Sequence, residues 1–241
     1  MKRFVLITRH PSDCVELQGL RASSDLTLRP YPVLRLEDIV DDPGWDVLSR
    51  ALPEIETSGW LVLASPRAPD RFVRSCRQRG LEKLHDLPAA AVGPSTARAA
   101  DDAGLRIELV GPGNGAGLAE MLVDTMKPNS QVVFACGKER RLELPQILEH
   151  AGHTVLPVVV YRMVSTPPRE LPPLGPSLEA VVLTSPRSAA LYLEGVGGRP
   201  LPCPHWALGS TTQQAAAGLG IECRIPQEPT MKSLAEELCT I

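Results

Sequence analysis

The sequence predicts an α/β protein with two similar domains, each built on an open parallel sheet that helices cover on both faces. Three observations support this prediction. Short apolar runs alternate with helical patterns along the chain, and motifs of its first half recur in its second half. The length of 241 residues suffices for two domains of about 110 residues, and the 43% of apolar residues allows each to bury a core.

Seven short apolar runs are typical of buried parallel strands, because such strands are covered on both faces and lack regularly spaced polar residues. These runs are residues 4–7, 61–63, 89–92, 132–135, 155–160, 181–183 and 206–208. Since the first run begins almost at the N-terminus, we expect no signal peptide ahead of it.

Eight segments have a helical pattern. They are residues 13–22, 69–79, 95–103, 118–126, 143–151, 188–194, 211–217 and 231–238. Gly104, Gly152 and Gly218 directly follow three of them, where a helix end favours a residue that tolerates positive φ. Strands that alternate with helices in this way indicate open parallel sheets.

The repeated motifs are turns that lead from a strand to a helix. Ser-Pro-Arg follows an apolar run at residues 65–67 and again at residues 185–187. Gly93 and Gly209 begin a second pair of turns, and Leu-Ala-Glu starts 25 residues after each of them. Two such units would place several helix N-termini around one cleft, which suits a ligand with several negative charges.

A fainter match between residues 30–35 and residues 157–162 extends the repeat, so the repeated parts follow the order a-b-a′-b′. This order alone places a domain boundary near Asn129. The clearest linker is residues 166–176, because its five prolines exclude a helix or a central strand.

Composition excludes several classes of function. The net charge of −3 gives no general attraction to nucleic acid or to an acidic membrane, and 4% of aromatic residues is too few for a stacking platform. The six cysteines form neither a CxxC pair nor a zinc-ligand spacing, and no apolar run approaches the length of a membrane span. We therefore expect a cytoplasmic protein with reduced thiols, no metal, no nucleic-acid partner and no membrane partner.

An ordered set of motifs along nearly the whole chain resembles the uroporphyrinogen-III synthase family. The set comprises Ser-Pro-Arg at residues 65–67, Val-Gly-Pro-Ser-Thr-Ala at 92–97, Gly-Asn-Gly-Ala-Gly-Leu-Ala at 113–119, Phe-Ala-Cys-Gly at 134–137, Val-Tyr-Arg at 160–162, and a second Ser-Pro-Arg and Gly-Ser-Thr-Thr at 185–187 and 209–212. Two positions depart from the family pattern. His10 stands between Thr8-Arg9 and the proline, and Ser210 replaces the proline of the second Gly-Pro turn.

The resemblance implies two flavodoxin-like domains that exchange their N-terminal segments and are joined by a two-stranded hinge. Residues 1–33 and 166–241 would form domain 1, and residues 38–160 would form domain 2. The hinge would be two antiparallel connecting strands at residues 33–37 and 160–165. Such a narrow hinge would let the domains move, so that a cleft opens and closes.

The resemblance also implies a reaction of haem biosynthesis. Family members are lyases that cyclise hydroxymethylbilane, a linear tetrapyrrole with eight carboxylates, to uroporphyrinogen III with loss of water. Ring D is inverted through a spiro-pyrrolenine intermediate. Because the substrate also cyclises without an enzyme, to the uninverted isomer I, the protein's task is to favour one geometry. A monomer without a cofactor is implied, and a transient contact with hydroxymethylbilane synthase is left open.

Three residues are candidates for a catalytic role. Tyr161 is the candidate for assisting departure of the hydroxyl group, since a phenol on a hinge strand can donate a proton or a hydrogen bond. Thr96 and Thr212 occupy matching positions in the two repeats. Helix N-termini, hydroxyl groups and cations are expected to bind the substrate carboxylates, and the candidates are Arg9, Ser65, Arg67, Ser95, Asn114, Gly115, Lys138, Arg140, Arg141, Ser185, Arg187, Ser210 and Thr211.

Simpler roles remain open for several of these residues. The serine and threonine hydroxyls can cap their own helices, and Tyr161 can pack as an ordinary strand residue. A solvated helix face is favoured for Arg71, Arg74, Arg77 and Arg79. The glycine-rich residues 111–117 lack the preceding buried strand of a dinucleotide loop, and His150 and His153 straddle a helix end, which disfavours a metal pair.

Two other classes of protein remain open. The first is a ligand-binding or regulatory module that kept the synthase fold and lost turnover. The presence of Tyr161 and of the basic stretch at residues 138–141 favours the enzyme over this alternative. The second is a flavodoxin-like or nucleotide-dependent enzyme, which would need aromatic residues to flank a flavin ring. The three Trp and three Tyr are scattered singly, which disfavours it.

Overall fold

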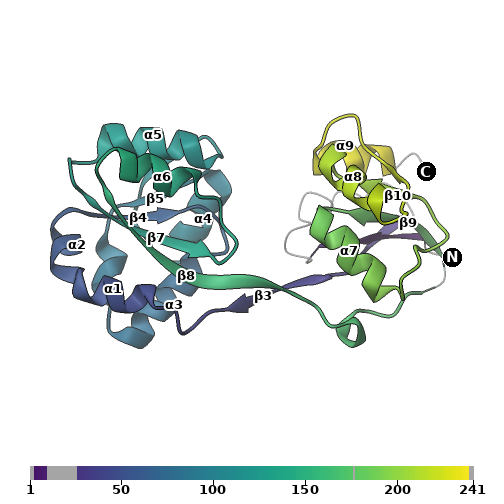
Figure 1. Ribbon diagram of the computed structural model, residues 1–241, viewed down its shortest axis with the longest axis horizontal. Coiled ribbons are helices and arrows are strands. Elements are labelled where there is room, and N and C mark those ends of the chain that lie inside the picture. Colours follow the sequence, from purple (N-terminus) through teal and green to yellow (C-terminus); the bar gives the residue numbers. More distant parts are fainter. Residues whose placement is uncertain (1–2, 10–25, 176, 239–241) are drawn as a thin grey trace. The chain divides into compact units, whose positions relative to one another are not determined.

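The structure, a computed structural model, describes residues 3–9, 26–175 and 177–238 (Figure 1). The chain divides into two compact units. Unit 1 combines Met1–Arg35 with Val164–Ile241, and unit 2 is Leu36–Met163. Both units alternate strands with helices and carry parallel sheets, which confirms the predicted α/β class. The helix predicted at residues 13–22 lies outside the described residues.

Unit 2 is built on a six-stranded sheet with the order β3-β8-β7-β4-β5-β6. The parallel pairs are β4 with β5, β4 with β7, β5 with β6, and β7 with β8. The strands are β3 (Leu34–Asp38), β4 (Gly59–Leu63), β5 (Ala89–Ala91), β6 (Ile107–Val110), β7 (Gln131–Gly137) and β8 (Thr154–Ser165).

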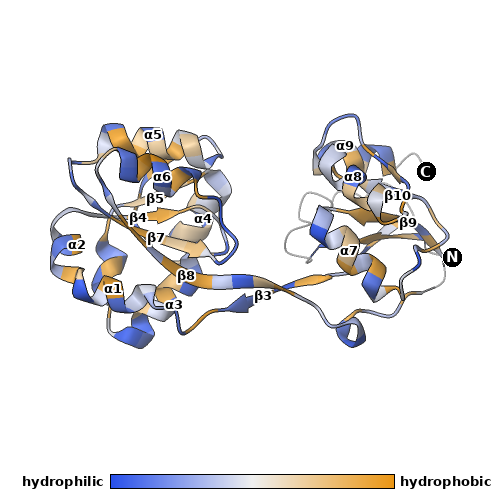
Figure 2. Ribbon diagram, viewed as in Figure 1, coloured by the Kyte–Doolittle hydropathy of each residue, from blue (hydrophilic) through white to orange (hydrophobic). Residues whose placement is uncertain are grey.

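Helices cover both faces of this sheet. Alternate residues of β7 point to opposite faces, so Val133 packs in one core and Val132 in the other. The core of Val133 is closed by α1 (Gly44–Arg50), α2 (Leu52–Ser58), α3 (Pro69–Arg79) and α4 (Pro94–Asp102). The core of Val132 is closed by α5 (Gly115–Thr125) and α6 (Glu143–His150). Figure 2 shows the apolar strands of the sheet between these two groups of helices.

Unit 1 is built on a five-stranded parallel sheet with the order β11-β10-β9-β1-β2. Its strands are β1 (Arg3–Ile7), β2 (Leu26–Pro30), β9 (Leu178–Leu183), β10 (His205–Ala207) and β11 (Cys223–Arg224). One face carries α7 (Pro186–Gly195) and α8 (Ser210–Gly218), and the other carries α9 (Met231–Leu238).

Two strands contain the boundary between the units. The boundary lies between Arg35 and Leu36 in β3, and between Met163 and Val164 in β8. Short 3₁₀ helices fill two of the connections, at Glu82–Asp86 and Pro168–Glu170. The second lies in the proline-rich linker of residues 166–176, so the prediction that this linker contains no helix was wrong for these three residues, because proline is tolerated in the first turn of a helix.

The structure also corrects the predicted elements. The helices α3 and α9 begin and end where the sequence predicts them. The prediction missed three strands, two α-helices and the two short 3₁₀ helices; the strands and α-helices are β2, β6, β11, α1 and α2. These elements are only two to seven residues long, so their apolar patterns are too short to stand out.

The predicted helix-end glycines are correct at two of three positions. Gly104 has φ +81° and Gly152 has φ +87°, as expected for a residue that reverses the chain after a helix. Gly218 is instead the last residue of α8, and the positive φ of +76° falls on Gly220. The prediction for Gly218 was therefore wrong by two residues, because the helix runs further than its apolar pattern.

The sequence repeat is visible in the backbone of the two glycine turns. Gly93 and Gly209 are the N-caps of α4 and α8, with extended φ values of −174° and −162°. In both turns the glycine carbonyl accepts hydrogen bonds from the N–H groups three and four residues later, which include those of Thr96 and Thr212. The turns match because the same residue types meet the same strand-to-helix geometry.

Candidate active site

A pocket lies in unit 2 at the carboxyl ends of its parallel strands. The chain goes from β4 to β5 on one side of β4, and later adds β7 on the other side. In open parallel sheets the point where this direction changes leaves a crevice at the strand ends. Ala64 and Ser65 after β4, and residues 134–137 of β7, line the pocket at this point.

The pocket has a volume of about 370 Å³. Its lining combines an apolar floor, which includes Phe134 and Leu144, with charged residues on the loop after β7 and at the start of α6. Arg140 and Arg141 bring positive charge, whereas Glu139 and Glu143 bring an equal negative charge. The position of each charge, rather than the net charge, therefore decides how the pocket receives an anion.

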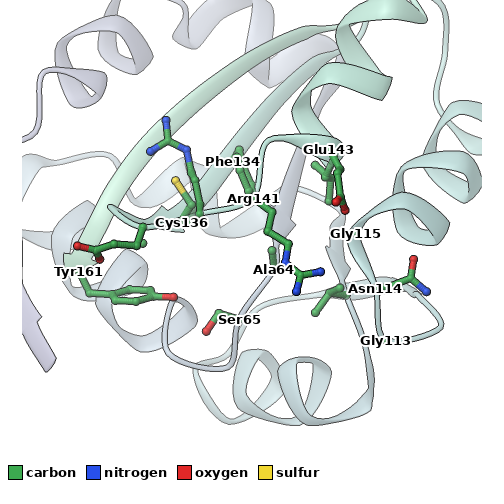
Figure 3. A pocket seen from close by; sticks show the side chains of 16 residues that line it. Ala64, Ser65, Gly113, Asn114, Gly115, Phe134, Cys136, Arg141, Glu143 and Tyr161 are labelled. Carbon is green, nitrogen blue, oxygen red and sulfur yellow. The ribbon is translucent and has the colours of Figure 1, made fainter. Parts of the chain in front are cut away.

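Tyr161 forms one wall of the pocket. It belongs to β8 and is only 8% exposed. Figure 3 shows its ring extending into the pocket with the hydroxyl group on the side of Ser65. The ring lies against Gly137, where a Cβ atom would be 2.7 Å from two ring carbons and 3.0 Å from the hydroxyl oxygen. The absence of a side chain at Gly137 thus makes room for the tyrosine.

The N-terminus of α5 forms the opposite wall. Asn114 caps the helix, because its side-chain oxygen accepts a hydrogen bond of 2.8 Å from the N–H of Gly117. Gly115 is the first residue of α5, and the N–H groups in the first turn of a helix have no acceptor within that helix. Both Asn114 and Gly115 line the pocket, so the positive end of the helix dipole faces it.

The loop after β4 differs from the predicted helix N-terminus. The N–H of Arg67 donates to the Ser65 hydroxyl oxygen at 3.2 Å, and the helix begins only at Pro69. Residues 65–67 therefore form a turn of their own. Of the three, Ser65 lines the pocket, and its hydroxyl hydrogen can still be donated.

The loop after β7 carries the basic residues. The N–H of Lys138 donates to the Tyr161 carbonyl at 2.9 Å, and the Lys138 side chain is exposed. Arg140 and Arg141 line the pocket, and Figure 3 shows the Arg141 side chain extending over it toward Asn114. These two arginines are the cations that the pocket presents to a ligand.

Cys136 also lines the pocket, as a neutral thiol. Burial raises its pKa to about 11, although the positive charge of Arg140 acts in the opposite direction. Its sulfur lies 3.6 Å from the Val158 carbonyl. Because a thiolate is the reactive form of cysteine, Cys136 packs here as a small apolar residue.

The two threonines that the repeat singled out are buried. Thr96 has no exposed surface, its hydroxyl oxygen has no hydrogen-bond partner among the described residues, and it does not line the pocket. Thr212 is 5% exposed. Ser95, Ser210 and Thr211, beside them in the turns, are exposed and open to a ligand.

In unit 1 the corresponding strand ends carry a network of hydroxyl groups. The Thr8 hydroxyl lies 3.0 Å from the Val182 carbonyl and 3.2 Å from the Ser188 hydroxyl. Ser185 caps α7 reciprocally with Ser188, which satisfies two N–H groups of the first turn. Ser185 is therefore a helix cap. The prediction missed that Ser188 is its partner, although the spacing Ser-x-x-Ser resembles a capping box.

The other two predicted binding residues of unit 1 are cations. Arg9 follows β1 and is half-buried, and Arg187 lies exposed in the first turn of α7. The structure thus brings Ser65, Asn114, Gly115, Arg140, Arg141 and Tyr161 into one pocket. The prediction did not include Gly137, Glu139 and Glu143, which line the same pocket.

Comparison with known proteins assigns the chain to a family. The sequence profile of uroporphyrinogen-III synthase HemD matches residues 25–236. The chain belongs to the uroporphyrinogen-III synthase family. It is also 25% identical, over 96% of each chain, to a protein of Methanothermobacter thermautotrophicus that carries the name putative uroporphyrinogen-III synthase.

Solved structures of uroporphyrinogen-III synthases share the fold. The enzyme from Helicobacter pylori 26695 aligns with a TM-score of 0.64 and 17% identity, covering 100% of this chain and 99% of the other. A mutant of the enzyme from Thermus thermophilus aligns with a TM-score of 0.55 and 17% identity, covering 98% and 96%. At this identity the likeness shows a shared two-domain α/β fold.

Two further findings concern the part of the chain that the structure describes. None of the helices described is long and apolar enough to cross a membrane. Within the described ranges, no three His, Cys, Asp or Glu side chains are grouped so that they could hold a metal ion.

Proposed function

We propose that this chain converts hydroxymethylbilane to uroporphyrinogen III, and that the unit 2 pocket receives part of this substrate. Membership of a family of cyclising hydro-lyases supports the reaction. The observation that carries the site is the position of Tyr161, whose hydroxyl shares the pocket with Arg140, Arg141 and the N-terminus of α5.

The reaction asks the protein mainly for positioning. The substrate loses its terminal hydroxyl group and the proton of the adjacent pyrrole nitrogen as water, which leaves an electrophilic azafulvene. The substituted carbon of ring D attacks this azafulvene, and the spiro-pyrrolenine that results breaks and recloses with ring D inverted. Because spontaneous closure gives the other isomer, the enzyme must hold ring D for attack through its substituted carbon.

Carboxylate groups of the substrate would be held by two kinds of donor in this pocket. The guanidinium groups of Arg140 and Arg141 offer charged hydrogen bonds, and the N–H of Gly115 offers the positive end of a helix dipole. Ser65 and Asn114 add a hydroxyl and an amide donor. Glu139 and Glu143 would repel carboxylates, so they limit where a carboxylate can lie.

Tyr161 would donate a hydrogen bond to the departing hydroxyl group. The family reaction needs no strong acid here, since the pyrrole nitrogen assists departure of the hydroxyl from within the substrate. A single phenol therefore orients and polarises the leaving group. We expect its removal to slow the reaction without abolishing it, because the remaining donors still position the substrate.

The other predicted residues keep proposed roles in binding. Arg67, Ser95 and Lys138 in unit 2, and Arg9, Ser185, Arg187, Ser210 and Thr211 in unit 1, are assigned to further carboxylates. The burial of Thr96 and Thr212 favours a role in holding the glycine turns rather than contact with substrate. The proposal further includes a cytoplasmic location, a monomer, the absence of a cofactor, and a transient contact with hydroxymethylbilane synthase. Light scattering with and without that enzyme would test the monomer and the contact.

The decisive experiment is a coupled assay in which hydroxymethylbilane synthase makes the substrate in place. The products are oxidised, and the uroporphyrin isomers are separated by chromatography. We expect isomer III to dominate in the presence of the chain, and Tyr161→Phe to give less isomer III at limiting enzyme. If folded protein leaves only isomer I, formed at the spontaneous rate, the proposed function is wrong.

A further inference from the structure

We infer that Arg71 and Glu139 are positioning residues that fasten the two loops of the pocket to strands β3 and β8. This inference rests on the proposed function of the pocket and extends it from the groups that bind the substrate to two side chains that hold the loops of the pocket. Arg71 holds the loop of residues 65–67, and Glu139 holds the loop of residues 138–141. The two attached strands are those that contain the boundary between the units.

Arg71 joins three segments of unit 2. It lies in the first turn of α3, its Nε is 2.7 Å from an Asp38 carboxylate oxygen, and one terminal nitrogen donates to the Arg67 carbonyl at 2.9 Å. Asp38 is the last residue of β3, and Arg67 belongs to the pocket loop. The bond to the Arg67 carbonyl is part-buried, whereas the bond to Asp38 is exposed, with 24% of the Arg71 side chain and 44% of the Asp38 side chain accessible. A planar guanidinium presents two separate nitrogens, Nε and a terminal nitrogen, to the two acceptors, whereas a lysine ammonium offers a single nitrogen.

Arg74 provides an internal comparison on the same helix. One of its terminal nitrogens lies 3.1 Å from the other Asp38 carboxylate oxygen, and its Nε lies 3.1 Å from Asp70. These are exposed ion pairs, with 49% of the Arg74 side chain accessible. Both arginines therefore contact Asp38, whereas the hydrogen bond to the loop carbonyl comes from Arg71.

Glu139 joins the second loop to β8. Its carboxylate accepts a hydrogen bond of 3.3 Å from the N–H of Met163, the last residue of unit 2. Two residues earlier in the strand, the Tyr161 carbonyl accepts from the N–H of Lys138. The loop is therefore attached to β8 at two adjacent points, and Arg140 and Arg141 follow directly after them.

The sign of the charge makes the role of Glu139 testable. A carboxylate next to Arg140 and Arg141 weakens the attraction of the pocket for the carboxylates of the substrate. If Glu139 acted through its charge alone, every neutral replacement would improve substrate binding. If it acts by holding the loop, a neutral side chain that still accepts the Met163 hydrogen bond will preserve activity, and one that cannot accept it will lose activity.

The Arg71 experiment uses the ratio of isomer III to isomer I at limiting enzyme and low substrate. Under these conditions the ratio of isomer III to isomer I is proportional to kcat/KM, because isomer I forms with a constant spontaneous rate constant. We expect Arg71→Ala to lower the ratio about three- to fivefold, since an exposed charged contact contributes at most about that factor. Arg71→Lys should be intermediate, and Arg74→Ala should match the native protein. Equal losses in Arg71→Ala and Arg74→Ala would overturn the role of Arg71.

The Glu139 experiment compares two neutral variants. Glu139→Gln keeps an oxygen acceptor for the Met163 N–H, so we expect an isomer ratio equal to or above that of the native protein. Glu139→Ala loses the acceptor, and we expect a ratio about two- to fourfold lower. Equal ratios for the two variants would show that only the charge matters and would overturn the inference.

Amide hydrogen exchange separates this inference from the proposed function, because it needs no turnover. Faster exchange at residues 65–68 in Arg71→Ala, but not in Arg74→Ala, supports the inference even if the native chain makes no isomer III. Faster exchange at residues 138–141 in Glu139→Ala, but not in Glu139→Gln, supports the second contact in the same way. Unchanged exchange in Arg71→Ala and Glu139→Ala would overturn the inference while leaving the proposed function intact.

Discussion

Replacement of Gly137 by alanine tests whether the position of the Tyr161 hydroxyl matters for the reaction. A Cβ atom at Gly137 would lie 2.7 Å from the Cε2 and Cζ atoms of Tyr161, whereas ordinary van der Waals contact begins at 3.4 Å. The ring must therefore retreat by the difference, about 0.7 Å. The substitution moves the hydroxyl without removing it.

The expected effects follow from the surroundings of the ring. Tyr161 is 8% exposed and belongs to the core that α1 to α4 close, so its retreat disturbs packed neighbours. Overpacking of this kind costs about 1–3 kcal/mol of stability. A displacement approaching 1 Å of a group that positions a reaction can cost up to about a hundredfold in rate, so we expect Gly137→Ala to lower kcat/KM about tenfold.

The assay is the isomer ratio at limiting enzyme, combined with urea unfolding of each variant. Gly218→Ala is the matched control, because a Cβ atom there meets nothing within 4 Å. In a Tyr161→Phe background the phenyl ring is still displaced but carries no hydroxyl, so Gly137→Ala should then have a much smaller effect on kcat/KM. An equal loss in both backgrounds would refute the reasoning, as would full activity of Gly137→Ala.

Three further predictions concern stability, each measured by urea unfolding. Asn114→Ala should lower the free energy of unfolding by about 1 kcal/mol because the Gly117 N–H loses its cap, whereas Asn114→Asp should retain most of it. Burial lowers the pKa of His153 in the folded chain. As pH falls, the His153 imidazole is therefore protonated first in the unfolded chain, and the free energy of unfolding should decrease below the unfolded pKa of about 6.5. His153→Gln should reduce that decrease. An identical dependence of stability on pH in the variant and the native chain would show that His153 does not cause it. Tyr192→Phe should cost about 1–3 kcal/mol, since the buried hydroxyl lies 2.8 Å from His205 Nε2; a cost near zero would show that this contact contributes nothing.

The sequence predicted the local structure well wherever a pattern extended over enough residues. The limits of α3 follow from Pro69 at its start and Gly80, with φ +68°, after its end. The glycine turns at Gly93 and Gly209 were recognised because they occur twice with identical spacing. The strand β6 was missed because its four residues alternate between half-buried and exposed at the edge of the sheet.

The candidate site was predicted only in part, because contacts between distant segments depend on sheet order. Tyr161 was identified from its motif, but its packing against Gly137 depends on the pairing of β7 with β8. The helical spacing of Arg71 predicts a solvated face, because it does not reveal that Asp38 and the Arg67 carbonyl lie within reach of the side chain. The place of Thr96 in the repeat predicts a catalytic role, but the packing of the tertiary structure buries this residue completely.

The sequence by itself therefore determined the α/β class, the repeated turns and the residue types at the ends of the strands, because apolar periodicity and turn chemistry act over a few neighbouring residues. The tertiary structure alone decided that β7 lies beside β4, which brings Ser65, Asn114, Arg141 and Tyr161 to one pocket. The physical reason is that sheet order is set by the burial of whole faces against helices, and no single segment of the sequence records that choice.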